Sequence, residues 1–309
     1  MDVIIIGAGS AGARHIFNTV LLGHEPVAVA DPFMAEELQV SGPTTYYRDP
    51  ERCLRERAEG SIVIIASPTM YHCEQTLLAI DCGCYALLVE KPMALNARQA
   101  ADMRDAAEAM GVLAAVGHNF RFHPIMEHYR MLIDKFPSPR VFTTIAVDDI
   151  MKWPTVVAHG KSSYVFDKDQ GGIVLTSSSH GVDLALFLNG AANYVTVTTE
   201  YTDAGLDKMV LVRLNHESGS VSIISNSWEN REYSVMTLMS PFYMTVIDLC
   251  RVSLKPDLIK MHERMMLAFL QYAGSGEAGD LCTFAGGHRV MEIIDAVRSN
   301  KEVSGGVVL

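Results

Sequence analysis

The stretch that decides the fold is Val3-Ile4-Ile5-Ile6-Gly7-Ala8-Gly9-Ser10-Ala11-Gly12. Four apolar residues precede the pattern G-x-G-x-x-G, and a segment of helical periodicity, Ala11–Leu22, follows it. The glycine pattern alone occurs in many proteins. Placed between a strand and a helix, however, it is typical of the first turn of a dinucleotide-binding domain of the Rossmann type.

Each glycine of this turn has a separate physical task. Gly7 permits the tight turn, Gly9 lets the backbone approach a pyrophosphate, and Gly12 lets the helix lie close to the strand. The pyrophosphate would then lie at the start of the helix, beside Ser10 and Ala11, where unpaired N–H groups and the helix dipole favour an anion. The turn therefore predicts a bound dinucleotide.

The second apolar run indicates which dinucleotide is bound. Val27–Ala30 ends in Asp31, which lies 19 positions after Gly12. A carboxylate at about this distance accepts hydrogen bonds from the adenosine ribose and repels a 2′-phosphate. Pro32 and Phe33 follow it and supply no cation for a phosphate. We therefore expect NAD, with NADP as the weaker candidate. The alternative role for Asp31 is that of a helix cap or turn residue.

The first 120 residues alternate short apolar runs with helical segments. The runs have the continuous apolar character of parallel strands covered on both faces: Val3–Ile6, Val27–Ala30, Ile62–Ala66, Ala86–Val89 and Leu113–Val116. Helical periodicity occupies the segments between them: Ala11–Leu22, Met34–Val40, Pro50–Ala58, Tyr71–Asp81 and Ala97–Met110. This alternation predicts an α/β domain with a doubly wound parallel sheet.

Strands dominate the remainder of the chain. After a predicted helix at Arg121–Phe136, we expect strands at Val141–Val147, Tyr194–Thr199, Met209–Leu214, Ser220–Ser225 and Tyr243–Ile247. One helix, His180–Leu188, lies among them, and Leu258–Tyr272 and Phe284–Asn300 end the chain as helices. We predict two domains: residues 1–120 bind the dinucleotide, and residues 121–309 form an α+β domain with a large, mostly antiparallel open sheet.

Composition narrows the possible functions and partners. The chain has 309 residues, 49% of them apolar, and a formal net charge of -11. Such an acidic globular protein is a poor partner for nucleic acid. No apolar run reaches the roughly 18–20 residues that span a bilayer, and no signal peptide is recognisable, so we expect a cytoplasmic protein with no membrane partner. The closest cysteines, Cys82 and Cys84, are spaced C-x-C, and we expect reduced thiols and no metal.

Four further stretches carry a resemblance to a known family: Ala66–His72, Glu90-Lys91-Pro92, Gly117–Phe122 and Gly172–Asp183. They resemble, in order, the A-T-P-N-x-x-H turn, the E-K-P motif, the interdomain crossover and the G-G-x-x-x-D-x-G-x-H-x-x-D segment of the family of glucose–fructose oxidoreductase and inositol dehydrogenase (Gfo/Idh/MocA). The resemblance covers essentially the whole chain in the family's order. It implies a dehydrogenase that acts on CH–OH groups. It also implies that Ser67, Pro68, Thr69, His72, Glu90 and Lys91 lie near the cofactor.

Lys91 and His180 are the predicted catalytic residues. Lys91 follows a buried strand at the carboxyl edge of the sheet, where ligands of open α/β sheets bind. It could hydrogen-bond the substrate oxygen and help to move its proton, or it could be a solvated surface lysine. His180 could accept a proton near neutral pH, and Asp183 shares its helix face. The resemblance implies that Lys91 and His180 act together at the substrate carbinol and that the Lys91–Pro92 bond is cis.

The chain departs from the family at one position. Thr176 stands where the family usually carries Asp, and threonine cannot act as a carboxylate base. We keep Thr176 and Asp183 as predicted substrate contacts, together with Asn119, Arg121, Trp153 and Tyr164. Arg121 could equally pair with a carboxylate, and the two aromatic residues could equally belong to the core.

We therefore predict hydride transfer between NAD and a secondary alcohol or ketone of a sugar, cyclitol or nucleotide-sugar-like substrate. Two alternatives remain open. One is an enzyme that oxidises its substrate transiently, as in glycoside cleavage without net redox change. The other is a regulatory, NAD-binding sensor that lacks turnover. We also expect a homodimer or homotetramer that forms through the C-terminal sheet, because an exposed apolar sheet face favours association.

Overall fold

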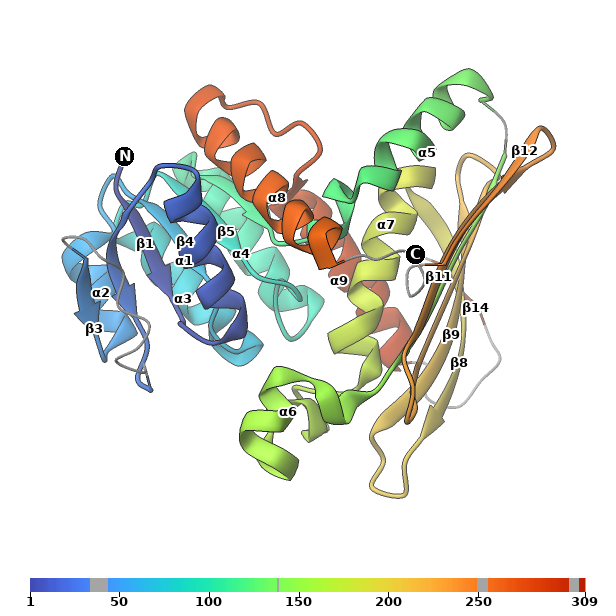
Figure 1. The fold of residues 1–309 in the computed structure, drawn as a ribbon, viewed down its shortest axis with the longest axis horizontal. Coiled ribbons are helices and arrows are strands. Elements are labelled where there is room, and N and C mark those ends of the chain that lie inside the picture. The colour runs from blue at the N-terminus through green and yellow to red at the C-terminus, as the bar shows by residue number, and fades with distance from the viewer. Residues whose placement is uncertain (34–43, 138, 249–254, 300–305, 309) are drawn as a thin grey trace. The chain divides into compact units, whose positions relative to one another are not determined.

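Five buried apolar strands form the centre of the first sheet (Figure 1). They are β1 (Val3–Ile6), β2 (Pro26–Ala30), β4 (Ile62–Ile65), β5 (Ala86–Val89) and β6 (Leu113–Val116). The sheet has the order β13-β6-β5-β4-β1-β2-β3, and its strands are parallel except at the β13 edge. Because β1, β4 and β5 are parallel neighbours, the residues that follow them lie at one edge of the sheet.

The helices that connect these strands match the predicted ones in type. They are α1 (Ser10–Leu21), α2 (Pro50–Arg57), α3 (His72–Asp81) and α4 (Ala97–Met110). Asp49 caps α2 by accepting from the N–H groups of Glu51 and Arg52, and Asn96 caps α4 in the same way. The structure describes residues 1–33, 44–137, 139–248, 255–299 and 306–308. The helix predicted at Met34–Val40 lies outside the described residues.

The chain divides into two compact units. The first comprises Met1–Phe122 and Met261–His288, and the second comprises His123–Lys260 and Arg289–Leu309. The division after Phe122 lies close to the predicted boundary at residue 120. Met261–His288, which we had placed in the second domain, joins the first unit because α8 (Lys255–Ser275) adds Met265 and Phe269 to the core around Val3 and Ile5. Strand β13 (Cys282–Thr283) then pairs with β6.

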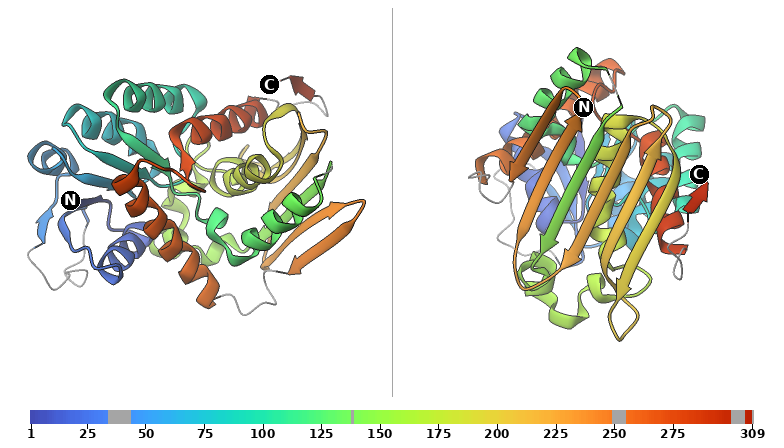
Figure 2. Two further views of the ribbon diagram at one scale, coloured as in Figure 1. Left: turned by 90° about the horizontal axis from the view of Figure 1, so that it is seen from above. Right: turned by 90° about the vertical axis from the view of Figure 1, so that its right-hand side faces the viewer.

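The second unit is built on a sheet with the order β12-β11-β7-β10-β9-β8-β14 (Figure 2). Its strands are β7 (Val141–Asp148), β8 (Ala192–Tyr201), β9 (Asp207–His216), β10 (Val221–Trp228), β11 (Tyr233–Ser240), β12 (Tyr243–Asp248) and β14 (Gly306–Val308). All neighbours are antiparallel except β7 and β10, which are parallel. The predicted fold class is therefore confirmed: an α/β unit of the Rossmann type and a mostly antiparallel second sheet.

The two faces of this second sheet differ. Helix α7 (Ser179–Asn189) covers one face, and Gly181 lies against Ile224 and Thr144 there. The other face carries exposed apolar side chains: Leu211, Tyr233, Met244 and Val246 are between 42% and 68% exposed. Within the described part of the chain, no helix is both long enough and apolar enough to cross a membrane.

Several elements differ from the sequence-based expectation. Strands β3 (Thr45–Tyr47), β11, β13 and β14 were not predicted. The helix predicted at Arg121–Phe136 instead consists of a short 3₁₀ turn, Asn119–Phe122, and α5 (Pro124–Lys135). The break has a local cause. Pro124 occupies the first helical turn, and the His123 ring accepts a hydrogen bond from the N–H of Ile125.

Gly181→Ala tests the close approach of α7 to the sheet. A Cβ at this position would lie 2.6 Å from Cγ2 of Ile224. We expect the free energy of unfolding to fall by about 1–3 kcal/mol, because the core must shift to accept the methyl group. The control is Gly274→Ala in α8, where a Cβ meets no atom within 4 Å. That change should leave stability unaltered or raise it slightly. Chemical denaturation of both variants measures the difference, and equal effects would contradict the expectation.

Candidate functional site

The glycine turn has the shape that a pyrophosphate requires. Gly7 has φ +92°, and a Cβ there would clash with the backbone at Ala66 and Ser67. A Cβ on Gly12 would lie 1.9 Å from the Gly7 carbonyl oxygen, whereas one on Gly9 would meet no atom within 4 Å. Gly9 thus faces open space, and no side chain caps the start of α1. The turn fits a dinucleotide, with Ser10 and Ala11 at the helix start.

Asp31 connects the end of β2 to the glycine turn. Its carboxylate accepts hydrogen bonds from the N–H of Ala8 at 2.7 Å and from the N–H of Phe33 at 2.7 Å. The residue therefore acts in the turn, as the alternative interpretation held, and its position beside the turn also suits a ribose contact. The structure adds a cation that sequence reasoning missed. The guanidinium of Arg48, just after β3, donates to the carbonyl of Pro32 at 3.2 Å.

The turn after β4 is held by His72. One ring nitrogen of this buried histidine lies 2.9 Å from the Ser67 carbonyl oxygen, and the other lies 3.0 Å from that of Pro92. Burial lowers the pKa of His72, although the two carbonyl contacts act against that shift. Thr69 is buried beside Pro68, and Ser67 donates to Gln75. His72 thus joins two predicted cofactor-binding turns, and both of its nitrogens are engaged with backbone oxygens.

Glu90 forms a largely buried hydrogen-bonded pair with His15 that the sequence did not reveal. One of its oxygens lies 2.8 Å from Nε2 of His15, and the other accepts the N–H of Lys91 at 3.1 Å. Burial alone would raise the pKa of Glu90. The hydrogen bond and charge of His15, helped by Lys91 and His262, instead lower it to about 2. The Lys91–Pro92 bond is cis, as the resemblance implied.

His15 is a second residue of the first unit, after Arg48, that sequence reasoning missed. It lies three positions after Gly12 and is 2% exposed. A histidine buried on the inner face of the helix that follows the glycine turn was a usable signal, because a buried imidazole needs a polar partner.

The residues after β6 have partners within the first unit. The Asn119 amide lies 2.9 Å from Nε2 of His262, and Arg121 donates to the carbonyls of Asp280 and Leu281. Arg121 therefore supports the backbone before β13. Both residues had been predicted to contact the substrate.

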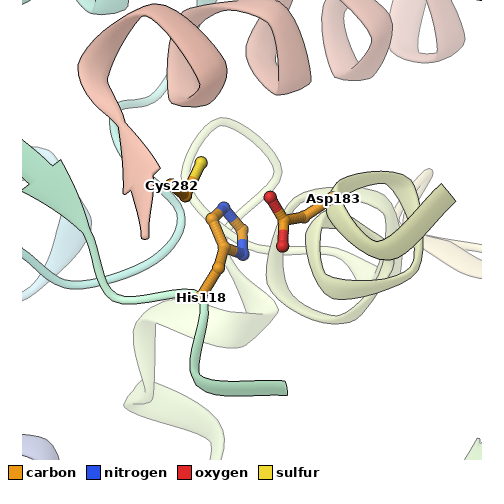
Figure 3. A group of neighbouring side chains, drawn as sticks. All are labelled: His118, Asp183 and Cys282. Atoms are coloured by element: carbon orange, nitrogen blue, oxygen red, sulfur yellow. The ribbon is translucent and has the colours of Figure 1, made fainter. Parts of the chain in front are cut away.

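Two buried side chains, His118 in the segment after β6 and Cys282 in β13, lie close together (Figure 3). The sulfur and a ring nitrogen are within 4.8 Å. Figure 3 also draws Asp183, which belongs to α7 of the second unit. Zinc sites use three or four protein ligands, so the two groups of the first unit do not by themselves form one.

In the second unit, the predicted residues Thr176, His180 and Asp183 lie where a π-helical turn, Val174–Ser178, leads into α7. The Thr176 hydroxyl donates to the Gly172 carbonyl at 2.6 Å, so it is used within the turn. His180 is half-buried near the start of α7, and Asp183 is buried one turn further on. A π-helical turn is rare and occurs frequently at functional sites.

An aromatic cluster lies at the end of β7 and β10. The ring centroids of Trp153 and Trp228 are 6.5 Å apart, and those of Phe166 and Trp228 are 6.4 Å apart, both in edge-to-face geometry. Tyr164 packs against the same group. Trp153 and Tyr164 are predicted substrate contacts, and that role stays a prediction. Trp228 was not predicted, because only the register of β10 brings it to this place.

The comparisons with known proteins agree with this geometry. Residues 1–118 match the model of the oxidoreductase family with an NAD-binding Rossmann fold, GFO_IDH_MocA. The chain is 26% identical over 242 residues to D-xylose 1-dehydrogenase (NADP(+)) 2 of Haloferax volcanii, covering 75% of this chain and 72% of that protein. It is 27% identical over 194 residues to scyllo-inositol 2-dehydrogenase (NAD(+)) of Bacillus subtilis, covering 60% and 53%.

A solved structure extends the likeness to both units. The myo-inositol dehydrogenase from Corynebacterium glutamicum superimposes with a TM-score of 0.85 at 19% identity, covering 100% of this chain and 98% of that one. At this identity the likeness establishes the fold. Together with the family match, it confirms the resemblance predicted from the sequence motifs.

Glu90→Gln tests the His15–Glu90 pair through the pH dependence of stability. The pKa of Glu90 is about 2 in the folded protein, below the ordinary value of 4.5. Its charge therefore stabilises the fold above about pH 4.5, and this contribution disappears as the pH falls toward 2. We expect the variant to have a lower Tm at pH 7 and the difference from wild type to shrink between pH 5 and pH 3. The exposed Glu74→Gln should show no such convergence. A constant difference across this range would contradict the assignment.

Proposed function

We propose that this chain, whose residues 1–118 match the model of the oxidoreductase family with an NAD-binding Rossmann fold (GFO_IDH_MocA), transfers hydride between a nicotinamide cofactor and a secondary alcohol or ketone of a sugar or cyclitol. The observation that carries the proposal is the edge of the first sheet. There the glycine turn, the His72 turn and the Glu90–Lys91 turn follow three parallel neighbouring strands. The names of the relatives, a xylose and an inositol dehydrogenase, support the substrate class.

The nicotinamide, when bound, supplies the hydride acceptor or donor. The residues of the chain must handle the proton and the oxygen, because loss of hydride from carbon is coupled to loss of a proton from the hydroxyl. We assign the Lys91 ammonium to the substrate oxygen, where it stabilises developing negative charge. Its backbone is held by Glu90. We assign proton transfer to His180, because an imidazole titrates near neutral pH.

The cofactor preference that we propose is NAD. Asp31 at the end of β2 places a negative charge where a 2′-phosphate would lie. Arg48 acts in the opposite direction, since its guanidinium lies near Pro32 and could pair with such a phosphate. One relative uses NADP+ and another NAD+ by name. We propose that the balance between Asp31 and Arg48 sets the preference.

Turnover is the direct test of the proposed reaction. We expect nicotinamide absorbance at 340 nm to change with at least one sugar or cyclitol, and Lys91→Ala or His180→Ala to lower kcat by about 10²–10⁴-fold, the range for lost acid–base or oxyanion contacts. The exposed Lys208→Ala and His24→Ala are the controls and should keep wild-type turnover. Tight cofactor binding without any turnover would favour a sensor, and Thr176 would then be the residue to explain.

Asp31→Asn and Arg48→Ala test the cofactor preference. Asp31→Asn keeps an acceptor for the Ala8 N–H and removes the charge, so the ratio of kcat/KM for NAD to that for NADP should fall by about 10-fold or more, as expected for a lost charge repulsion of ~1.4 kcal/mol. Arg48→Ala should raise the same ratio by weakening NADP. Arg52→Ala, an exposed change on α2, is the control. If the ratio is the same in all four proteins, Asp31 and Arg48 do not set the preference.

A further inference from the structure

A carboxylate lies beside the π-helical turn of the second unit. Asp148 is the last residue of β7, and its Oδ2 accepts the Ser177 hydroxyl at 3.3 Å. Ser177 precedes His180 by three residues. Asp148 is half-buried. Asp148 thus supplies a carboxylate next to this turn, whereas Thr176 within the turn supplies only a hydroxyl.

The neighbouring hydroxyls are used within the fold. Thr176 donates to the Gly172 carbonyl at 2.6 Å, and Ser178 donates to the Asn226 amide oxygen at 3.0 Å. Both residues are buried, at 5% and 0% exposure. In contrast, Ser177 points its hydroxyl at an ionisable group. A carboxylate offers about four acceptor positions, so it can serve this hydroxyl together with other donors.

The aromatic cluster lies next to Asp148. Trp228 is the register partner of Asp148 in the parallel pair β7–β10, and Trp153 and Phe166 contact Trp228 edge to face. The indole N–H of Trp228 is buried and has no acceptor among the described residues. An aromatic surface beside a carboxylate suits a polyol. The C–H faces of the polyol pack on the aromatic rings, and its hydroxyls donate hydrogen bonds to the carboxylate.

We propose that Asp148 is a substrate-binding residue that accepts hydrogen bonds from hydroxyl groups of a sugar or cyclitol, with Ser177 holding its carboxylate in position. The substrate class rests on the proposed function. The negative charge that recognises the polyol then lies at the end of β7, beside the turn that leads to His180.

A purely structural role is the competing explanation, since the Asp148–Ser177 hydrogen bond also joins β7 to the π-helical turn. Two variants separate these roles. Asp148→Asn keeps the shape and an acceptor for Ser177 but removes the charge. Ser177→Ala removes the hydrogen bond but keeps the carboxylate. If the contact only supports the turn, Ser177→Ala should be at least as damaging as Asp148→Asn, in both Tm and KM.

The adjacent carboxylate supplies a matched control. Asp149 accepts the N–H of Met151 and pairs with Lys152, so it is engaged in its own turn. Asp149→Asn removes the same charge one residue away. A substrate-binding role for Asp148 predicts that this control keeps the wild-type KM.

The experiment uses two readouts on the full-length protein with NAD present. The first is the KM and kcat for D-xylose, D-glucose, myo-inositol and scyllo-inositol. The second is tryptophan fluorescence during titration with the same compounds. Trp153 and Trp228 are the two tryptophans of the chain, and both lie in the aromatic cluster, so fluorescence reports polyol binding without requiring turnover.

We expect Asp148→Asn to raise KM and the fluorescence Kd by about 10- to 100-fold, the range for a lost hydrogen bond to a charged group. Ser177→Ala should raise them by less, and Asp149→Asn should leave them unchanged. Saturable binding without turnover, lost in Asp148→Asn, would support the inference while the proposed reaction fails. The inference is overturned if Asp148→Asn matches the wild type, if Ser177→Ala equals or exceeds its effect, or if the wild type shows neither turnover nor a saturable fluorescence change.

Discussion

The hydrogen bond between His15 and Glu90 joins the helix of the glycine turn to the strand end that carries Lys91. A buried carboxylate is costly unless it is paired and hydrogen-bonded. Glu90 meets this requirement by accepting from His15 and from the N–H of Lys91. A Cβ on Gly117 would lie 3.3 Å from the Glu90 carboxyl carbon, so the end of β6 also approaches it closely. Helix α1, the Lys91 turn and the start of the segment after β6 therefore all meet at one largely buried carboxylate.

Much of the fold follows from local patterns in the sequence. The five inner strands of the first sheet are continuous apolar runs, and such runs predict buried parallel strands without further information. Strand β3 was missed because it is only three residues long, Thr45–Tyr47, and only partly apolar. Strand β11 was missed because Tyr233–Ser240 mixes polar and apolar residues, and its conformation depends on pairing with β7, which is distant in sequence, as well as with the adjacent β12.

The candidate site likewise contains residues that local motifs predict and residues that only the tertiary fold brings into place. The glycine turn, Asp31, the His72 turn and the Glu90-Lys91-Pro92 turn are local motifs, and the structure places them along the carboxyl edge of one sheet. Three features depend on the tertiary fold and left no local signal. Arg48 reaches Pro32 because β3 pairs with β2, Trp228 meets Trp153 because of strand register, and Asp148 meets Ser177 because β7 ends beside the π-helical turn. The π-helical turn itself has no periodicity that distinguishes it from an α-helix over five residues.

Because Met261–His288 belongs to the first unit, the order of synthesis affects how that unit folds. The core around Val3 and Ile5 is completed by Met265 and Phe269 of α8, and the open edge of the sheet at β6 is covered by β13. During synthesis from the N-terminus, residues 1–122 leave the ribosome long before these parts exist. The cofactor-binding unit can therefore acquire its full core only after the residues that build most of the second unit have been translated. For that interval, the β6 edge and the apolar surface that α8 later covers are available to chaperones.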